Sequence, residues 1–193
     1  MHKRHANSLV DWPNELEARQ MLVAITRGDR SALTRLYIGY YGCLAHFLSQ
    51  FMASDDRIPD VINDAFTTIW ETARGISFES KLSVWFFRIA HRHALKFVRC
   101  HAPRGLAGCE REYDAQTREP ETETKTRRPL SWPLQRLPAE QRVVLMLCYR
   151  MAFSVREIAF ITDSQDETVR LRMSQAREQL RRFPVALDEE QSI

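Results

Sequence analysis

The chain has 193 residues, of which 44% are hydrophobic and 27% charged, and its formal net charge at neutral pH is +3. No apolar run approaches the roughly 20 residues that a membrane-spanning helix needs. The basic start of the chain lacks the apolar segment of a secretory signal. We therefore expect a cytoplasmic protein without direct membrane insertion, whose four cysteines, none in a CxxC pair, stay reduced.

Apolar residues at helical spacing predict four helices in the first half of the chain. They cover approximately residues 16–25, 31–51, 61–70 and 82–99. Gly28 and Asp29 end the first of them, and Ser31 begins the second. Each helix has its own apolar stripe, so we expect the four to bury one another as a bundle.

The pattern disappears between residues 103 and 133, where prolines and glycines stand among mixed charges, a composition typical of a flexible linker. Beyond it, Leu137 and Pro138 begin a further helix. We therefore predict an all-α protein of two small helical domains, residues 1–102 and 134–193, joined by a linker over residues 103–133. Cys43 and Cys148 fall within apolar helical patterns and should be buried. Cys100 and Cys109, in or beside the linker, should be exposed.

Residues 154–182 read as two short helices separated by a tight polar turn. Ser154 with Glu157, and Ser164 with Glu167, have the spacing of a capping box, which predicts a start for each helix. In the second helix an apolar stripe consists of Val169, Met173, Ala176 and Leu180. The remaining faces carry polar and basic residues, which favours a DNA-reading helix-turn-helix over an amphipathic surface hairpin with merely solvated arginines.

The helix over residues 82–99 carries a regular row of basic residues: Arg88, Arg92, Lys96 and Arg99. Like charges at this spacing repel one another, so a polyanion facing them is the economical explanation. Three aromatic residues lie beside the row. Trp85 and Phe86 belong to the apolar stripe and should be core, whereas we expect Phe87 to be exposed and able to stack on a base.

The motifs PDVINDAFTTIW and VWFFRIAHRHALKFVR, followed by the helix pair of residues 154–182, resemble bacterial RNA polymerase sigma factors of the extracytoplasmic-function (ECF) group. The resemblance covers nearly everything from residue 22 to residue 182. It implies a sigma factor that binds core RNA polymerase, through the β′ clamp helices and the β flap, and promoter DNA. It also implies an anti-sigma factor as a further partner.

The resemblance assigns the candidate site residues to three groups. Core polymerase is expected to be bound by Asp60, Asn63 and Asp64. The minus-10 element is expected to be bound by Phe87, Arg88, Arg92, Lys96 and Arg99. The minus-35 element is expected to be bound by Thr168, Arg170, Leu171, Arg172, Ser174 and Gln175. Four positions depart from the family pattern: Asn63 replaces glutamine, Arg92 replaces asparagine, Glu167 replaces glycine and Leu171 replaces a small polar residue.

Three other readings remain. One is a two-domain helix-turn-helix regulator with a helical sensory domain, which would need neither the acidic helix face nor the basic row. A metal- or redox-sensing module on Cys100, His101 and Cys109 lacks the paired spacing of a zinc site. An enzyme would need a nucleophile or an acid–base pair, and the histidines show no such partner in a motif. We predict no catalytic residue, no metal site and no cofactor.

Overall fold

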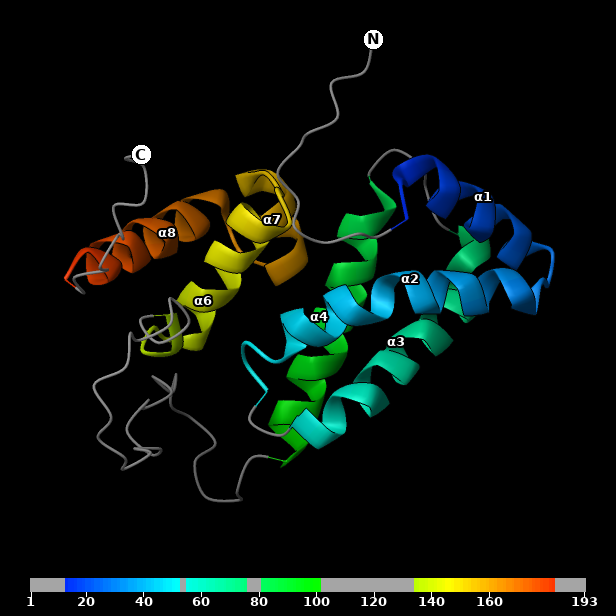
Figure 1. Ribbon diagram of the computed structural model, residues 1–193, viewed down its shortest axis with the longest axis horizontal. Coiled ribbons are helices and arrows are strands. Elements are labelled where there is room, and N and C mark those ends of the chain that lie inside the picture. The colour runs from blue at the N-terminus through cyan, green and yellow to red at the C-terminus, as the bar shows by residue number, and fades with distance from the viewer. Residues whose placement is uncertain (1–12, 53–54, 76–80, 102–133, 183–193) are drawn as a thin grey trace, which may run out of the picture.

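The computed structural model describes residues 13–52, 55–75, 81–101 and 134–182, and these residues contain helices but no strand (Figure 1). The all-α prediction is therefore confirmed. The helices are α1 (Glu15–Thr26), α2 (Arg30–Leu48), α3 (Ile58–Thr72), α4 (Leu82–His101), α6 (Ala139–Leu145), α7 (Val155–Thr162) and α8 (Asp166–Arg181). Short turns of other helical type are η1 (Asp55–Arg57), η2 (Ala73–Gly75) and the π-helical η3 (Met146–Arg150). The predicted linker, residues 103–133, lies outside the described residues.

Helices α1 to α4 form the first helical unit, as the four apolar stripes predict. Asn14 and Glu17 form a capping box that starts α1, and Gly28, with a φ of +87°, ends that helix region. The side chain of Asp29 then accepts hydrogen bonds from the amides of Ser31 and Ala32, which fixes the start of α2. The largest fully buried side chains of this unit include Leu22, Leu36, Tyr40, Phe47, Ile62 and Phe86.

The first turn of α4 is hydrogen-bonded to a side chain of α1. The Leu82 amide donates a hydrogen bond of 2.9 Å to Glu15 Oε1, and the Arg19 Nε donates one of 3.0 Å to the same oxygen. A carboxylate on α1 therefore satisfies an amide in the first turn of α4 that has no partner within its own helix.

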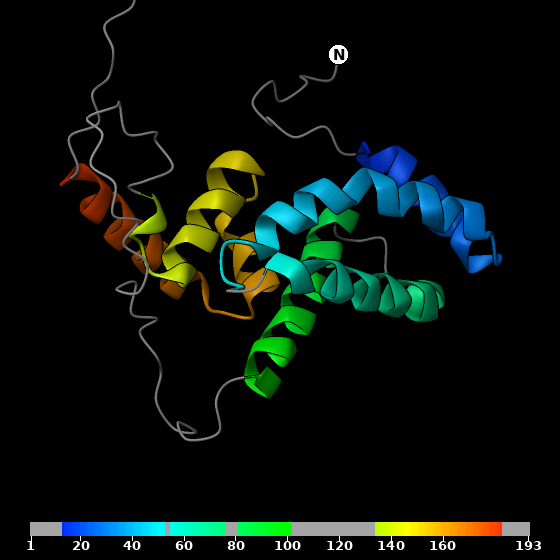
Figure 2. The ribbon, with the colours of Figure 1, turned by 60° about the horizontal axis from the view of Figure 1, so that its bottom comes forward.

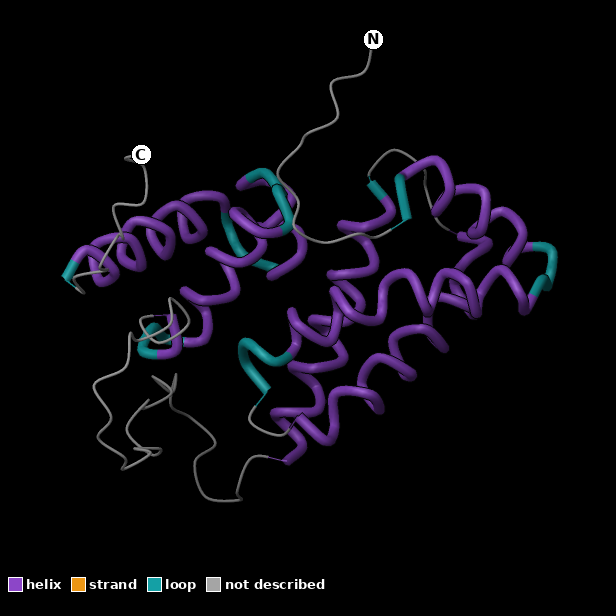
Figure 3. The backbone as a smooth tube through the Cα atoms, viewed as in Figure 1, coloured by secondary structure: helices purple, strands orange, loops and turns teal. Residues whose placement is uncertain are grey.

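Helices α6, α7 and α8 form the second helical unit (Figure 3). The predicted capping box at the start of α7 is confirmed, because the Glu157 carboxylate accepts from the Ser154 amide at 2.7 Å and the Glu157 amide donates to Ser154 Oγ at 3.3 Å. The second predicted capping box is wrong. Helix α8 begins at Asp166 with Gln165 in the cap position and no side-chain cap, and Ser164 Oγ instead donates to the Thr162 carbonyl.

The two helical units pack against each other along α4 and α7, with α6 to α8 on one side of α4 and α1 to α3 on the other (Figures 1 and 2). Most of their buried residues form one continuous core cluster, while Leu137, Leu145 and Ala176 form a second, smaller cluster. Arg142 also links the two units, because its guanidinium donates two hydrogen bonds, of 2.7 and 3.1 Å, to the Gln50 carbonyl in the turn that follows α2. No helix within the described part of the chain is long and apolar enough to cross a membrane.

Candidate nucleic-acid interface

Helices α7 and α8 form a helix-turn-helix whose second helix has one buried and one exposed face. Asp163 ends α7 in the left-handed conformation, with a φ of 54°, which an aspartate tolerates better than most residues. On α8 the buried residues are Val169, Met173 and Ala176, three of the four members of the predicted apolar stripe, and the fourth, Leu180, is half-buried. The exposed residues on the outward face are Arg170, Leu171, Ser174 and Gln175, while Thr168 is half-buried. Arg170, Leu171 and Ser174 therefore lie clear of the core, whereas Gln175 Oε1 accepts a hydrogen bond of 3.4 Å from the buried Gln141 side chain of α6.

Arg170 and Arg172 lie in different surroundings although both belong to α8. The side chain of Arg170 is 62% exposed, and its guanidinium lies 3.8 Å from the Glu167 carboxylate, one turn back on the same helix. Arg172 is 23% exposed, forms an ion pair with Glu140 of α6 and donates a hydrogen bond of 3.2 Å to Ser164 Oγ. Arg172 therefore anchors α8 to α6, whereas Arg170 points away from the core.

The acidic partner of Arg172 is Glu140 and not Glu157, which belongs to the capping box of α7. Glu157 forms an ion pair of 2.8 Å with Lys81, which precedes α4. Burial raises the pKa of the Glu157 carboxyl, but hydrogen bonds from Lys81 and Ser154 outweigh that effect and hold the pKa below its usual value. The ion pair adds a polar contact between the two helical units.

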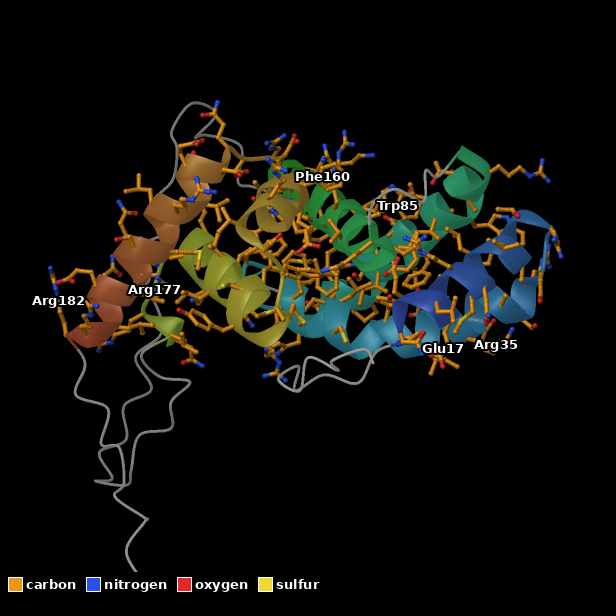
Figure 4. All side chains as sticks on the ribbon, turned by 90° about the horizontal axis from the view of Figure 1, so that it is seen from above. Glu17, Arg35, Trp85, Phe160, Arg177 and Arg182 are labelled. Atoms are coloured by element: carbon orange, nitrogen blue, oxygen red, sulfur yellow. The ribbon has the colours of Figure 1, made fainter. Side chains whose placement is uncertain are left out.

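The basic row on α4 is divided by the packing of the two units. Arg92, Lys96 and Arg99 are exposed. The Arg88 guanidinium instead lies 4.0 Å above the Phe160 ring of α7, and it donates to the Phe160 carbonyl at 3.0 Å and to Asp163 Oδ1 at 3.1 Å. Phe160 lies where α7 packs against α4 (Figure 4). A cation at the carboxyl end of a helix is favourable because the last carbonyls of the helix have no partner within it.

Phe87 is fully buried, so the prediction that it is exposed is wrong. Its ring lies 5.1 Å from that of Phe47 in α2 and 5.4 Å from that of Phe153 in the segment before α7. The cause is that α4 is covered on two sides, by α2 and α3 and by α7. The spacing of Val84, Phe87 and His91 is a second helical stripe that could have indicated this. Phe86 is buried and Trp85 half-buried, in agreement with their predicted place in the core.

The acidic and polar face of α3 is exposed at Asp60, Asn63 and Asp64. The Tyr37 hydroxyl donates a hydrogen bond of 3.0 Å to Asn63 Oδ1, which orients this amide. Arg57 lies 3.4 Å from Asp60, in the turn that precedes the helix. The face thus presents two carboxylates and one oriented amide to a partner.

Histidines and cysteines show no metal centre: in the part of the chain that the structure describes, no group of three or more His, Cys, Asp or Glu could hold a metal ion. Cys43 is buried and Cys100 exposed, as predicted, whereas Cys148 is only half-buried. Cys109 and the side chain of His101 lie outside the described residues. His93 shares a hydrogen bond of 2.8 Å with Thr68 Oγ1, so it is a partnered histidine beside the core.

The chain is similar to known proteins in sequence. The family model for sigma-70, region 4, matches residues 134–180. The chain is 26% identical over 179 residues to the ECF RNA polymerase sigma-E factor of Haemophilus influenzae, covering 86% of this chain and 94% of that protein. It is 25% identical over 177 residues to the ECF RNA polymerase sigma-E factor of Escherichia coli K12, with coverage of 85% and 92%.

Two solved structures share the fold. One is CnrH in complex with the cytosolic domain of CnrY, with a TM-score of 0.59, 18% identity and coverage of 86% of this chain and 96% of that one. The other is the sigma factor RpoE in complex with the anti-sigma factor NepR from Bartonella quintana, with a TM-score of 0.57, 19% identity and coverage of 77% and 94%.

Proposed function

Since the chain belongs to the extracytoplasmic-function group of bacterial RNA polymerase sigma factors, we propose that it binds core RNA polymerase and directs promoter recognition, DNA melting and the start of transcription. The observation that carries this proposal is the exposed polar face of α8, in a helix-turn-helix within the segment that resembles sigma-70 region 4. A sensory helical domain would not need the acidic face of α3 or the basic row of α4, so the regulator reading is not favoured.

The two helical units bind different parts of the polymerase and of the promoter. Residues 1–102 bind core polymerase and the minus-10 element, residues 134–193 bind the minus-35 element and the β flap, and residues 103–133 join them. The α3 face of Asp60, Asn63 and Asp64 binds the β′ clamp helices. Its exposure and its negative charge support this assignment, because carboxylates without a buried role suit a basic partner surface.

The remaining basic row of α4 binds the minus-10 DNA. Arg92, Lys96 and Arg99 are exposed, so they can bind phosphates while α4 remains packed against α7. Arg88 can do so only after it leaves Phe160 and Asp163, because the same guanidinium cannot serve α7 and a phosphate at once. We therefore propose that α4 and α7 separate when the promoter is bound.

On α8, the exposed Arg170 reads a base edge in the major groove, where a guanidinium can bind guanine through two hydrogen bonds. Arg172 keeps the helix oriented through Glu140. Thr168, Ser174 and Gln175 contact the backbone or neighbouring bases. The protein contributes binding and positioning and no chemistry of its own, and it acts in the cytoplasm with the polymerase.

An anti-sigma factor is a further proposed partner. The Bartonella quintana RpoE, which shares the fold of this chain, is bound to the anti-sigma factor NepR in its solved structure. We propose that a protein of this class holds the chain inactive until it is released.

Transcription from a library of promoter fragments by core polymerase, with and without this protein, tests the function. We expect a set of promoters that share a minus-10 and a minus-35 element and that are transcribed only when the protein is present. Transcripts unchanged by the protein would refute the proposal.

The assignment of the α3 face has its own test. Asp60→Lys combined with Asp64→Lys should abolish co-purification with core polymerase and leave thermal unfolding nearly unchanged, since both side chains are exposed. Glu178→Lys, an exposed charge reversal on α8, is the control and should still co-purify. Full retention of the polymerase by the double variant would show that this face does not bind it.

A further inference from the structure

Leu171 is the one large apolar side chain that α8 exposes. It is 58% exposed, whereas Val169, Met173 and Ala176 of the same helix are buried and Leu180 is half-buried. Its neighbours on the outward face, Arg170, Ser174 and Gln175, are all polar. The core of the second helical unit is therefore complete without Leu171, and its side chain is available to a partner.

The place of Leu171 in the helix-turn-helix restricts what that partner can be. It lies in the second turn of α8, directly after Arg170, and so in the half of a recognition helix that meets base edges when the helix enters the major groove. Leucine has neither a donor nor an acceptor for a base edge. The apolar group that the major groove presents is the 5-methyl group of thymine.

We propose that Leu171 is a specificity-determining residue that selects a thymine in the minus-35 element by packing against its 5-methyl group. The inference rests on the proposed function, because it needs α8 in the major groove of a promoter. It adds to that function a discrimination that Arg170 cannot supply: a guanidinium recognises guanine through its acceptors, whereas Leu171 distinguishes thymine from cytosine at a neighbouring base pair.

A single exposed leucine is also common on protein surfaces, so the test must isolate the methyl group. A promoter selected by the polymerase and the full-length protein is prepared with each thymine of the minus-35 element, on either strand, replaced in turn by deoxyuridine. Deoxyuridine lacks only the 5-methyl group. At one position the wild-type holoenzyme should bind the deoxyuridine promoter about fourfold more weakly, the effect of one apolar carbon group lost from a contact.

The variant Leu171→Ala should bind the thymine promoter more weakly than wild type does and should bind the deoxyuridine promoter with the same affinity as the thymine promoter. Alanine favours a helix, so the fold is retained, and circular dichroism checks this. Leu16→Ala is the matched control, because Leu16 is 66% exposed on α1 and far from the recognition helix in the chain. That variant should keep the wild-type discrimination.

Three results would overturn the inference. The first is a minus-35 element on which no deoxyuridine substitution changes binding, although binding depends on the element. The second is a Leu171→Ala holoenzyme that still distinguishes thymine from deoxyuridine. Either result leaves the proposed function intact. The third is a polymerase that ignores the minus-35 element altogether, which would overturn the proposed minus-35 role of α8 together with the inference.

Discussion

Acidification should destabilise the folded protein through His91, a buried histidine of α4. His91 is 8% exposed, and its ring centre lies 5.5 Å from that of Phe51 and 6.1 Å from that of Phe47. Its Nδ1 has no hydrogen-bond partner among the described residues. Burial lowers the pKa of His91 from 6.5 to about 4, against a smaller opposing effect of the Asp163 carboxylate. The folded state therefore holds this imidazole neutral.

The sign and the size of the effect follow from these two pKa values. In the unfolded chain His91 takes up a proton as the pH falls below 6.5, while in the folded protein it stays neutral until the pH approaches 4. Above pH 6.5 both states hold His91 neutral, so the histidine does not lower the unfolding free energy. As the pH falls toward 4, protonation of the unfolded chain alone lowers the unfolding free energy progressively. The gap between the two values corresponds to about 3 kcal/mol of unfolding free energy, at about 1.4 kcal/mol for each pH unit.

Urea unfolding of wild type and of His91→Leu, measured from neutral pH down to about pH 4, tests this reasoning. The variant cannot titrate at this position, and the acidic groups common to both proteins cancel in the difference. We expect the unfolding free energy of wild type to fall by about 3 kcal/mol relative to that of His91→Leu across this range. A His46→Gln variant, at an exposed position, should show a much smaller change. Parallel stability curves for wild type and His91→Leu would refute the assignment, as would an imidazole that titrates near 6.5 in the folded protein.

Other predictions concern α8, the contact between α4 and α7, and the cysteines. Arg170→Ala should cost about 1–3 kcal/mol in promoter binding and relax the preference at one minus-35 base pair. Arg172→Ala should lower the unfolding free energy by about 1 kcal/mol and weaken binding to all sequences alike. Affinities for single-base promoter variants check both predictions, and a uniform loss for Arg170→Ala with a selective loss for Arg172→Ala would contradict them. Phe160→Ala should loosen the contact with the α4 guanidinium by about 0.5–1 kcal/mol, so spin labels on α2 and α8 should report longer distances; an unchanged distance distribution would show that the contact does not hold the units together. Cys100 should react with a thiol reagent far faster than Cys43, whose pKa burial raises to about 11; equal rates would contradict the described burial.

The helices and the helix-turn-helix could be predicted because their signals are local. Apolar spacing identifies a helix from its own residues, and the Ser154 capping box depends on residues three apart. The same spacing at Ser164 misled the prediction, because the left-handed Asp163 shifts the start of α8 by one residue and the Ser164 hydroxyl bonds to Thr162 and Arg172 instead.

The errors at the candidate site have a common physical origin in contacts between distant parts of the chain. Nothing near Phe87 in the sequence indicates that Phe153 covers it, and nothing near Arg172 indicates Glu140 as its partner. The basic row of α4 was recognised as one feature, yet packing on α7 separates Arg88 from the rest. Periodicity finds the faces of a helix but does not tell which partner covers each face.

The hydrogen bond from the Leu82 amide to Glu15 joins groups 67 positions apart in the chain. Closing so long a loop costs entropy before the contact repays it, so the first turn of α4 should be completed late in folding, after α1 has docked on the bundle. The helix that carries the basic row thus has its starting point set by a remote element. Sequence changes in α1 can therefore shift the onset of α4, and with it the placement of that row against DNA, without altering any residue of α4.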